Sequence, residues 1–459
     1  MDNQKFGKLS FGEKFGYSLG DTAANLAWRP LMAYLPIFYV DTFGLSNKSV
    51  ALLLLLTRIF DGFTDIIMGT IADRTQSRWG KFRPYLLWTA LPFGVCLALT
   101  WTTPDFGPSG RLIWAYITYN FLTLVYTANN VPYSSLTGVM TGNVLERTNV
   151  SSYRFFGAYL GGGISLILIP YLVDYFGKGS EATGYQYTFY LLSGMLVFFS
   201  LIAFFSTRER IKPPKAQISN LKEDFKIQLR NRPWVIMLIV GALWVAYNSI
   251  RQGSAPFYFK WYIGNNNLVA GFFGATIVAS IISSFIATPL TRFFGKRKLF
   301  VLAMVISGIF TCSIFFLKST DVTLMFVLGS LAELAAGIMP ILYFAMLGDT
   351  ADYSEFKNNR RATGLAYSAG SFAMKFGGGI AGAITIIVLN IFDYVGKEGS
   401  ATEVLMQSDK AIFGIRLINS FVPVAFIVIA ILVILLYPLS TSKMQEVEAE
   451  LKSRKEKEE

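Results

Sequence analysis

The segment that decides the fold covers residues 50–71 and reads VALLLLLTRIFDGFTDIIMGTI. It is apolar over the length of a membrane-spanning helix, which needs about 20 residues. Asp61 and Asp65 interrupt it. Because an ionisable residue at the centre of a bilayer costs roughly 2.5–3.5 kcal/mol on the insertion scale, two in one span indicate a function. Their spacing puts both carboxylates on one helix face, about one turn apart.

The composition of the whole chain agrees with this interpretation. Of 459 residues, 53% are hydrophobic and only 15% are charged, whereas a soluble chain of this length carries far more surface charge. Apolar runs of about 20 residues recur from end to end. The sequence therefore predicts an all-α membrane protein that crosses the bilayer many times.

The basic residues follow the positive-inside pattern. The formal charge of +12 comes from 41 basic and 29 acidic residues, and the basic ones gather in alternate connections between spans. This pattern places both termini in the cytoplasm and predicts an even number of spans. The partner that it indicates is membrane lipid, not nucleic acid. The basic groups are Arg74, Arg78, Lys81 and Arg83; residues 208–232; Arg292, Lys296, Arg297 and Lys298; Lys357, Arg360 and Arg361; and the tail from Lys443.

The sequence lacks residues on which many enzymes and metal sites depend. The chain has no histidine, and its two cysteines, Cys96 and Cys312, both fall inside apolar runs. They read as small core residues and not as a disulfide or a metal pair. Residues 1–14 are polar and are followed by no cleavage site, so we expect no cleavable signal peptide. We expect no enzyme, no cofactor, and no metal beyond a possible Na⁺.

Counting apolar segments gives about twelve spans in two halves. We expect an N-terminal six-helix bundle over residues 1–206, a cytoplasmic middle loop over 207–232, a C-terminal six-helix bundle over 233–440 and a cytoplasmic, helical tail over 441–459. The expected spans are 16–40, 46–72, 84–103, 111–140, 150–175, 186–206, 234–262, 267–293, 298–317, 323–348, 363–392 and 411–438.

An internal repeat supports the two halves. Gly80-Lys81 recurs as Gly295-Lys296, 215 residues later, and the glycine triplet 161–163 recurs 216 residues later at 377–379. Tyr153 has a counterpart in Tyr367. Two similar halves are typical of transporters built from parallel repeats. Chance alignment of glycine-rich helices is the alternative.

Polar residues inside the spans have two interpretations. They line a central polar cavity, or they join helices and reach the membrane surface from helix ends. Besides the aspartates of residues 50–71, the candidates are Asp21, Arg29, Thr127, Asn129, Asn130, Arg154, Asn248, Arg251, Gln252 and Lys375.

The aspartate pair suits a cation. Asp61, Asp65 and the hydroxyls of Thr64 and Thr127 supply only oxygen, which hard cations such as Na⁺ prefer. Without a metal ion, one of two close carboxylates takes up a proton. The pair therefore fits either Na⁺ or H⁺. Arg58, three residues before Asp61, leaves a structural ion pair as the alternative.

At these residues the chain resembles the glycoside–pentoside–hexuronide:cation symporters, a family of the major facilitator fold that includes the melibiose and glucuronide permeases. The likeness extends over nearly the whole chain, from GYSLGD at residues 16–21 to Ser440. The motifs that carry it are LTRIFDGFTDIIMG (56–69), ADRTQSRWGKFRPY (72–85), NNVPYSSL (129–136), YRFFG (153–157) and GDTADYSEF (348–356).

The resemblance implies roles for matching positions. It assigns the coupling cation to Asp61, Asp65 and Thr127, with Thr64 at a position where the melibiose permease has Asn. It assigns the sugar to Asp21, Asn130, Arg154 and Lys375. Asn130 and Ser134 depart from the melibiose pattern, which favours xyloside- or glucuronide-like substrates. It also implies a cytoplasmic gate formed by Arg74, Arg78, Lys81, Arg147, Asp349, Asp352 and Glu355.

The sequence thus predicts a secondary active transporter that couples a sugar or glycoside to H⁺ or Na⁺ by alternating access, and acts as a monomer. The same fold also suits a lysolipid or amphiphile carrier, in which Arg154 and Lys375 would hold a phosphate. A sugar sensor that does not transport is the other alternative.

Overall fold

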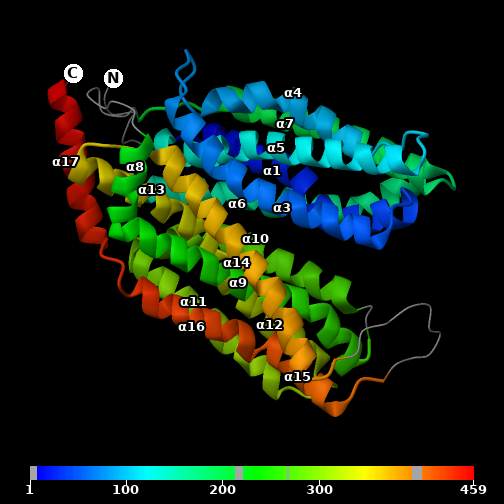
Figure 1. Cartoon of the computed structure of the whole chain (residues 1–459). Helices are drawn as coiled ribbons and strands as arrows, with labels where there is room; N and C mark the ends of the chain where they lie inside the picture. The colour runs from blue at the N-terminus through cyan, green and yellow to red at the C-terminus, as the bar shows by residue number, and fades with distance from the viewer. Residues whose placement is uncertain (1–7, 212–220, 266–267, 395–405, 459) are drawn as a thin grey trace. The chain divides into compact units, whose positions relative to one another are not determined.

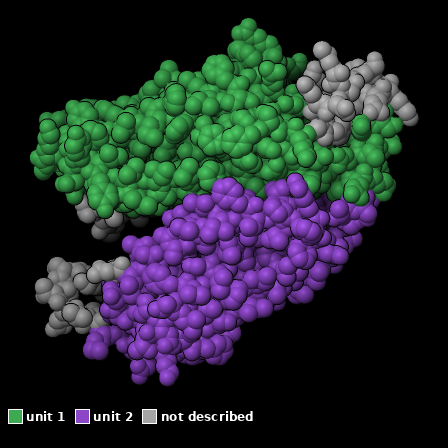
Figure 2. Space-filling model, turned by 180° about the vertical axis from the view of Figure 1, so that it is seen from behind, with its two compact units in different colours: residues 1–230, 344–371, 444–459 green, residues 231–343, 372–443 purple. Residues whose placement is uncertain are grey.

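The computed structural model describes residues 8–211, 221–265, 268–394 and 406–458, and the regular elements within these ranges are helical (Figure 1). The chain divides into two compact units, coloured separately in Figure 2. Unit 1 is Met1–Arg230, Phe344–Ser371 and Met444–Glu459, and unit 2 is Asn231–Tyr343 and Phe372–Lys443. The predicted all-α class is confirmed. The division of the chain into two six-helix halves stays a prediction.

Unit 1 contains the helices from the N-terminal part of the chain. They are α1 (Phe11–Ala33), α2 (Leu35–Ile37), η2 (Phe38–Thr42), α3 (Asn47–Arg74), α4 (Arg83–Thr100), α5 (Pro108–Met140), α6 (Val144–Gly177), α7 (Glu181–Ser206) and α8 (Leu221–Arg230).

Unit 2 contains most of the remaining helices, and three helices have residues in both units. Unit 2 holds α9 (Arg232–Phe257), η3 (Tyr258–Ile263), α10 (Leu268–Phe294), α11 (Lys296–Ser313), η4 (Ile314–Phe316), α12 (Val322–Ala336), α15 (Asp409–Asn419) and α16 (Phe421–Ile434). The helices divided between the units are α13 (Ile338–Asn358), α14 (Thr363–Ile391) and α17 (Thr441–Glu458).

Local chemistry explains where several helices begin and end. Ser10 caps α1 by accepting a hydrogen bond from the backbone N–H of Glu13. Proline stands in the first turn of α4, α5 and α9, where its missing N–H costs nothing. The expected tenth and twelfth spans are each interrupted, at Gly337 and at Ser420. Pro213 and Pro214 of the middle loop lie outside the described residues.

Eight helical segments within the described ranges are long and apolar enough to cross a membrane, and they match the last eight expected spans. The first four expected spans correspond to α1, α3, α4 and α5. These helices carry more polar residues or are shorter, and three of them, α1, α3 and α5, hold predicted cation and sugar residues. The charged residues within α1 and α3 make these helices less apolar than ordinary membrane spans.

Glycines allow the helices of unit 1 to approach closely. On α6, a Cβ added to Gly161 would lie 2.6 Å from the backbone oxygen of Thr22 on α1. Thr22 Oγ1 donates to the carbonyl of Gly157 across the same contact. Small residues at such crossings are typical of membrane helices. The α1–α6 contact therefore fixes the positions of the charged residues that both helices carry.

Candidate cation and sugar sites

The two aspartates of α3 face one hydroxyl on α5. Asp61 and Asp65 are each 1% exposed. Thr127 Oγ1 lies 2.9 Å from Asp61 Oδ1 and 3.2 Å from Asp65 Oδ1. The one-turn spacing on α3 and a single residue of α5 thus bring three oxygen-bearing side chains together.

The structure describes the contacts of Thr64 but not the side chain of Arg58. Thr64 is buried, and its hydroxyl donates to the backbone carbonyl of Asp61 at 3.0 Å, within its own helix. Its proton is therefore used inside α3, while its lone pairs stay available. The side chain of Arg58 lies outside the described residues, so its predicted ion pair stays a prediction.

The chemistry of this cluster selects for a positive charge. The Thr127 hydroxyl is shared by two buried carboxylates, and two carboxylates this close repel each other unless a positive charge or a proton neutralises one of them. The side-chain donors are all oxygen, which is the ligand type of hard metal cations. The arrangement fits Na⁺ or H⁺.

A second charged cluster joins α1, α5 and α6. Arg154 Nε lies 2.6 Å from Asp21 Oδ2, and Arg154 Nη2 donates to Ser134 Oγ at 2.9 Å. Both charged residues are about 4% exposed. The Phe344 ring lies 4.3 Å from the guanidinium. Arg154 Nη1 is buried without a hydrogen-bond partner in the described part of the chain, so this pair retains a donor for a ligand.

Tyr133 positions Asp21 through the backbone of α1. Its hydroxyl donates to the carbonyl of Tyr17 at 2.7 Å and accepts from the N–H of Asp21 at 3.2 Å. These are the two groups that an α-helix normally joins to each other. A Cβ on Gly20 would collide with the Tyr133 ring. Gly20 therefore admits the ring, and the ring holds the backbone that carries the carboxylate.

One face of α5 connects the two clusters. Thr127, Asn130 and Ser134 follow helical spacing, so they share a face. Asn130 is half-buried and makes no hydrogen bond to any residue that the structure describes. Its amide lies between the aspartate pair and Arg154 along the helix. Tyr126 interacts electrostatically with Asp21 and with both aspartates of α3.

Lys375, the fourth predicted sugar residue, lies on α14 in unit 2, where it is half-buried. The other three, Asp21, Asn130 and Arg154, lie in unit 1. The structure brings Asp21 and Arg154 into direct contact. The role of Lys375 stays a prediction.

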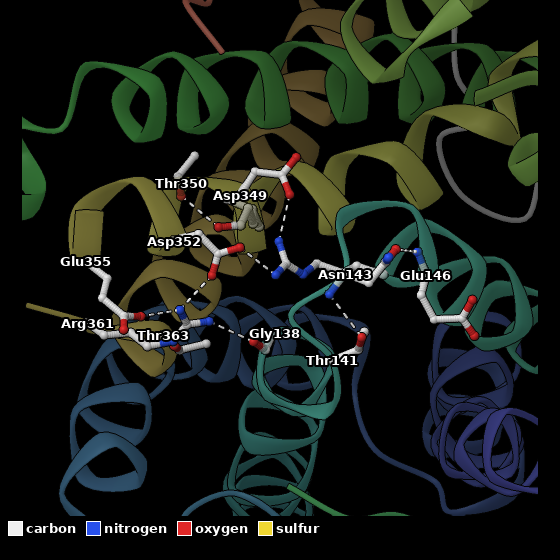
Figure 3. A network of polar contacts seen from close by, with 12 residues as sticks. Gly138, Thr141, Asn143, Glu146, Asp349, Thr350, Asp352, Glu355, Arg361 and Thr363 are labelled. Carbon is white, nitrogen blue, oxygen red and sulfur yellow. Dashed lines mark hydrogen bonds and ion pairs between the residues drawn. The ribbon is translucent and has the colours of Figure 1, made fainter. Parts of the chain in front are cut away.

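Four of the predicted gate residues form one network in unit 1 (Figure 3). Arg147 on α6 pairs with Asp349 at 2.7 Å and with Asp352 at 2.6 Å, both on α13. Arg361 lies 2.6 Å from Asp352 and 2.7 Å from Glu355. It also donates to the carbonyl of Gly138 at 2.8 Å.

Arg361 was not among the predicted gate residues, although the pair Arg360-Arg361 stands among the basic groups of the sequence. Burial alone would lower the pKa of Arg361, but the carboxylates of Asp352 and Glu355 raise it above its ordinary value. The guanidinium thus stays charged at physiological pH.

The other predicted gate residues have separate contacts. Lys81 Nζ donates to the carbonyl of Asp73 at 2.7 Å, and the Asp73 carboxylate accepts from the first N–H groups of α14, Gly364 and Leu365. Arg74 and Arg78 are exposed, and Arg78 lies 4.3 Å from the Trp79 ring centre. Their part in a gate stays a prediction.

Sequence comparison identifies the family. Residues 16–441 match the family described as MFS/sugar transport protein. The chain belongs to this family. It is 34% identical over 405 residues to the isoprimeverose transporter of Lactiplantibacillus pentosus, covering 86% of this chain and 84% of that protein. It is 30% identical to the glucuronide carrier protein homolog of Escherichia coli, covering 98% and 97%.

Solved structures of major facilitator proteins share the fold. The proton:xylose symporter XylE, bound to 6-bromo-6-deoxy-D-glucose, gives a TM-score of 0.65 at 15% identity and covers 96% of this chain and 98% of its own. The transporter FucP in the outward conformation gives 0.67 at 14% identity, covering 94% and 98%. This MFS/sugar transport protein is therefore a multi-pass membrane transporter and not an enzyme.

Proposed function

We propose that this transporter carries a glycoside together with one coupling cation, and that Asp61, Asp65 and Thr127 bind the cation. The observation that carries the proposal is the position of the Thr127 hydroxyl within hydrogen-bond distance of both carboxylates. Two buried acidic groups this close favour a positive charge beside them, and Na⁺ or H⁺ supplies one in this proposal. Thr64 is a further oxygen in the same turn of α3.

The sugar binds at Asp21, Arg154 and Asn130 of unit 1 in this proposal. Arg154 Nη1 and the Asn130 amide supply polar groups without partners in the described residues, and such groups are what sugar hydroxyls need. The cited relatives carry names that refer to isoprimeverose and glucuronide. These names support a xyloside- or glucuronide-like substrate.

Coupling runs through α5. Thr127 contacts the cation residues and Ser134 contacts Arg154, seven residues apart on one helix face. A cation that fixes α5 against α3 also fixes the helix that supports Arg154. By linkage, the sugar then raises the affinity for the cation by the same factor.

Alternating access completes the proposed mechanism. The network of Arg147, Arg361, Asp349, Asp352 and Glu355 closes the cytoplasmic side, and both termini lie in the cytoplasm of a bacterial inner membrane. Basic residues near the middle loop and the tail support this orientation. We propose that the monomer is the working unit.

The direct test is sugar-driven ion movement in inside-out and right-side-out vesicles that contain the purified protein. p-Nitrophenyl β-D-xyloside and p-nitrophenyl β-D-glucuronide are added with and without a Na⁺ gradient, and with and without a pH gradient. The uptake of each glycoside is measured under each condition. Asp61→Asn and Asp65→Asn should each abolish uphill accumulation, because the cation then loses one of its two carboxylate ligands. Exchange of sugar down its gradient should persist.

The control is Asp105→Asn, a loss of one carboxylate in an exposed connection. It should leave accumulation unchanged. Gradient-driven accumulation at the wild-type level in both α3 variants would remove the aspartates from the cation site. Absence of any glycoside transport in the wild type would remove the sugar function itself.

A further inference from the structure

Arg29 is a charged residue of α1 that the proposed cation and sugar sites do not use. It lies eight residues after Asp21, and the less buried positions of this part of α1 are Asn25, Trp28, Arg29 and Met32. These positions follow helical spacing, so they form one stripe that continues from Asp21. Asn25 Nδ2 donates to the carbonyl of Asp21 at 2.9 Å, within this stripe.

This stripe continues into the ligand-binding region of unit 1. Trp28 stacks on Tyr126 of α5 with ring centres 4.5 Å apart. Tyr126 in turn interacts electrostatically with Asp21 and with the aspartates of α3. Arg29 follows Trp28 directly and lies one turn after Asn25, on the stripe that continues from Asp21.

The guanidinium of Arg29 has no counter-charge in the described residues. Arg29 makes no ion pair or hydrogen bond there, and Tyr159 of α6 is the titratable group within its electrostatic reach. Asp21, the nearest acidic residue along α1, is already paired with Arg154 at 2.6 Å. Charges in membrane spans are almost always paired or face an aqueous cavity, because an unpaired one costs roughly 2.5–3.5 kcal/mol on the insertion scale.

The α6 backbone accommodates Arg29 by means of a glycine. A Cβ on Gly162 would lie 2.7 Å from Arg29 Cγ and 3.3 Å from Nε. Two hydrogen bonds fix α6 beside α1 on either side of this point, from Thr22 Oγ1 to the carbonyl of Gly157 and from the Tyr34 hydroxyl to that of Leu166. The side-chain stem of Arg29 therefore has a defined place against α6.

We propose that Arg29 binds the anionic group of an acidic glycoside. This inference rests on the proposed sugar transport and names the class of sugar. Asp21 is paired with Arg154, so the positive charge of Arg29 has no acidic partner among the residues that the structure describes. A carboxylate, sulfonate or phosphate on the substrate neutralises it, and the planar guanidinium can hold two oxygens of such a group at once.

The separation along the helix suits one ligand that touches both places. Eight residues of α-helix rise about 12 Å, and side chains lean toward the helix N-terminus, so the Arg29 side chain leans toward Asp21. The sugar hydroxyls bind at Asp21 and Arg154, and the acidic group of the same molecule reaches Arg29.

The test compares substrates that differ only in charge. Binding of p-nitrophenyl β-D-glucuronide, its neutral methyl ester and p-nitrophenyl β-D-glucoside is measured by calorimetry with the full-length protein in nanodiscs. A sulfonated glucoside and glucose 6-phosphate distinguish among carboxylate, sulfonate and phosphate. We expect the wild type to bind at least one acidic compound ten-fold or more tightly than its neutral analogue.

Arg29→Gln should remove that preference and leave the affinity for the neutral compounds within about two-fold, while Arg29→Lys should retain part of it. Gly162→Ala, which displaces the Arg29 stem, should weaken only acidic ligands and serves as the second variant if Arg29→Gln does not fold. Arg292→Gln, which removes an exposed charge at the end of α10, is the control. It should change the affinity for neither the acidic nor the neutral compounds.

The two levels of the hypothesis fail differently. A wild type that binds neutral glycosides but shows no preference for acidic ones, or an Arg29→Gln variant that loses both classes equally, overturns the role of Arg29 and leaves sugar transport standing. A wild type that binds no glycoside of either class overturns the proposed function.

Discussion

At the scale of single residues, the hydroxyl of Thr127 has two carboxylates within hydrogen-bond distance. It is one donor shared between two carboxylates, at 2.9 and 3.2 Å. A hydrogen bond to a charged group contributes about 1.5–3 kcal/mol, and its loss in a buried site is not replaced by water. If the aspartates bind the cation as proposed, Thr127 tunes the cation affinity without carrying a charge of its own.

Thr127→Val keeps the shape of the side chain and removes the hydroxyl. We expect the apparent cation affinity to fall roughly 10- to 150-fold, which is the equivalent of about 1.5–3 kcal/mol. The measurement is the cation dependence of glycoside binding by calorimetry. Thr123→Val is the matched control, because the Thr123 hydroxyl donates to the carbonyl of Tyr119 within α5. Equal effects of the two variants would contradict a specific role for Thr127.

The residue scale also shows how far the sequence could predict the site. The spacing of Asp61 and Asp65 within one apolar run predicts their common face, because helical periodicity is a local property. The contacts of Ser134 with Arg154 and of Tyr133 with the Asp21 backbone depend on the register of α5 against α1 and α6. No spacing within one helix encodes that register, so these contacts come from the structure alone.

At the scale of helices, the α1–α5 contact depends on the absence of a side chain at Gly20. Gly20→Ala would force its Cβ into the Tyr133 ring. Overpacking of this kind typically costs about 1–3 kcal/mol. We expect a lower melting temperature in detergent and weaker glycoside binding, because Tyr133 holds the backbone at Asp21.

Gly12→Ala is the control for that change. Gly12 lies on the same helix with nothing within 4 Å of an added Cβ. Alanine there should leave stability unchanged or raise it by up to about 1 kcal/mol through helix propensity. A Gly20→Ala protein that melts and binds like Gly12→Ala would show that the Tyr133 ring moves away freely.

A buried ion pair connects two helices of unit 2. Arg251 of α9 pairs with Glu333 of α12, and Ser280 of α10 donates to Glu333 Oε1 at 2.8 Å. Removing one partner of a buried pair costs about 3–5 kcal/mol, whereas replacing both by apolar residues is often neutral. We expect Glu333→Leu to lower the melting temperature and Arg251→Met with Glu333→Leu to restore it. No recovery in the double variant would mean that Arg251 has further obligatory contacts.

At the scale of the molecule, the repeat noted in the sequence has structural counterparts. Gly80 and Gly295 both have positive φ, 114° and 73°, shortly before α4 and α11 begin. Gly161 of α6 lies against Thr22 of α1, and Gly377 of α14 lies against Ala242 of α9. The first helix of each predicted half thus meets a glycine of the corresponding triplet.

Apolar length predicted the spans, but not the helix breaks at Gly337 and Ser420, which depend on local packing.

The network around Arg361 bears on the whole transport cycle. Arg361 is buried and holds Asp352, Glu355 and the carbonyl of Gly138 together, so Arg361→Gln leaves two buried carboxylates short of a counter-charge. If this network closes the cytoplasmic side, the variant should favour the inward-open state.

Asn130→Cys, in a background with Cys96 and Cys312 replaced by alanine, reports this opening by its labelling rate with a membrane-impermeant maleimide in inside-out vesicles. We expect the rate to rise several-fold with Arg361→Gln and uphill accumulation to fall. Arg292→Gln, which removes an exposed guanidinium from the end of α10, should leave both unchanged. A labelling rate that stays at the background level in the Arg361 variant would separate the network from the gate and leave it a structural element of unit 1.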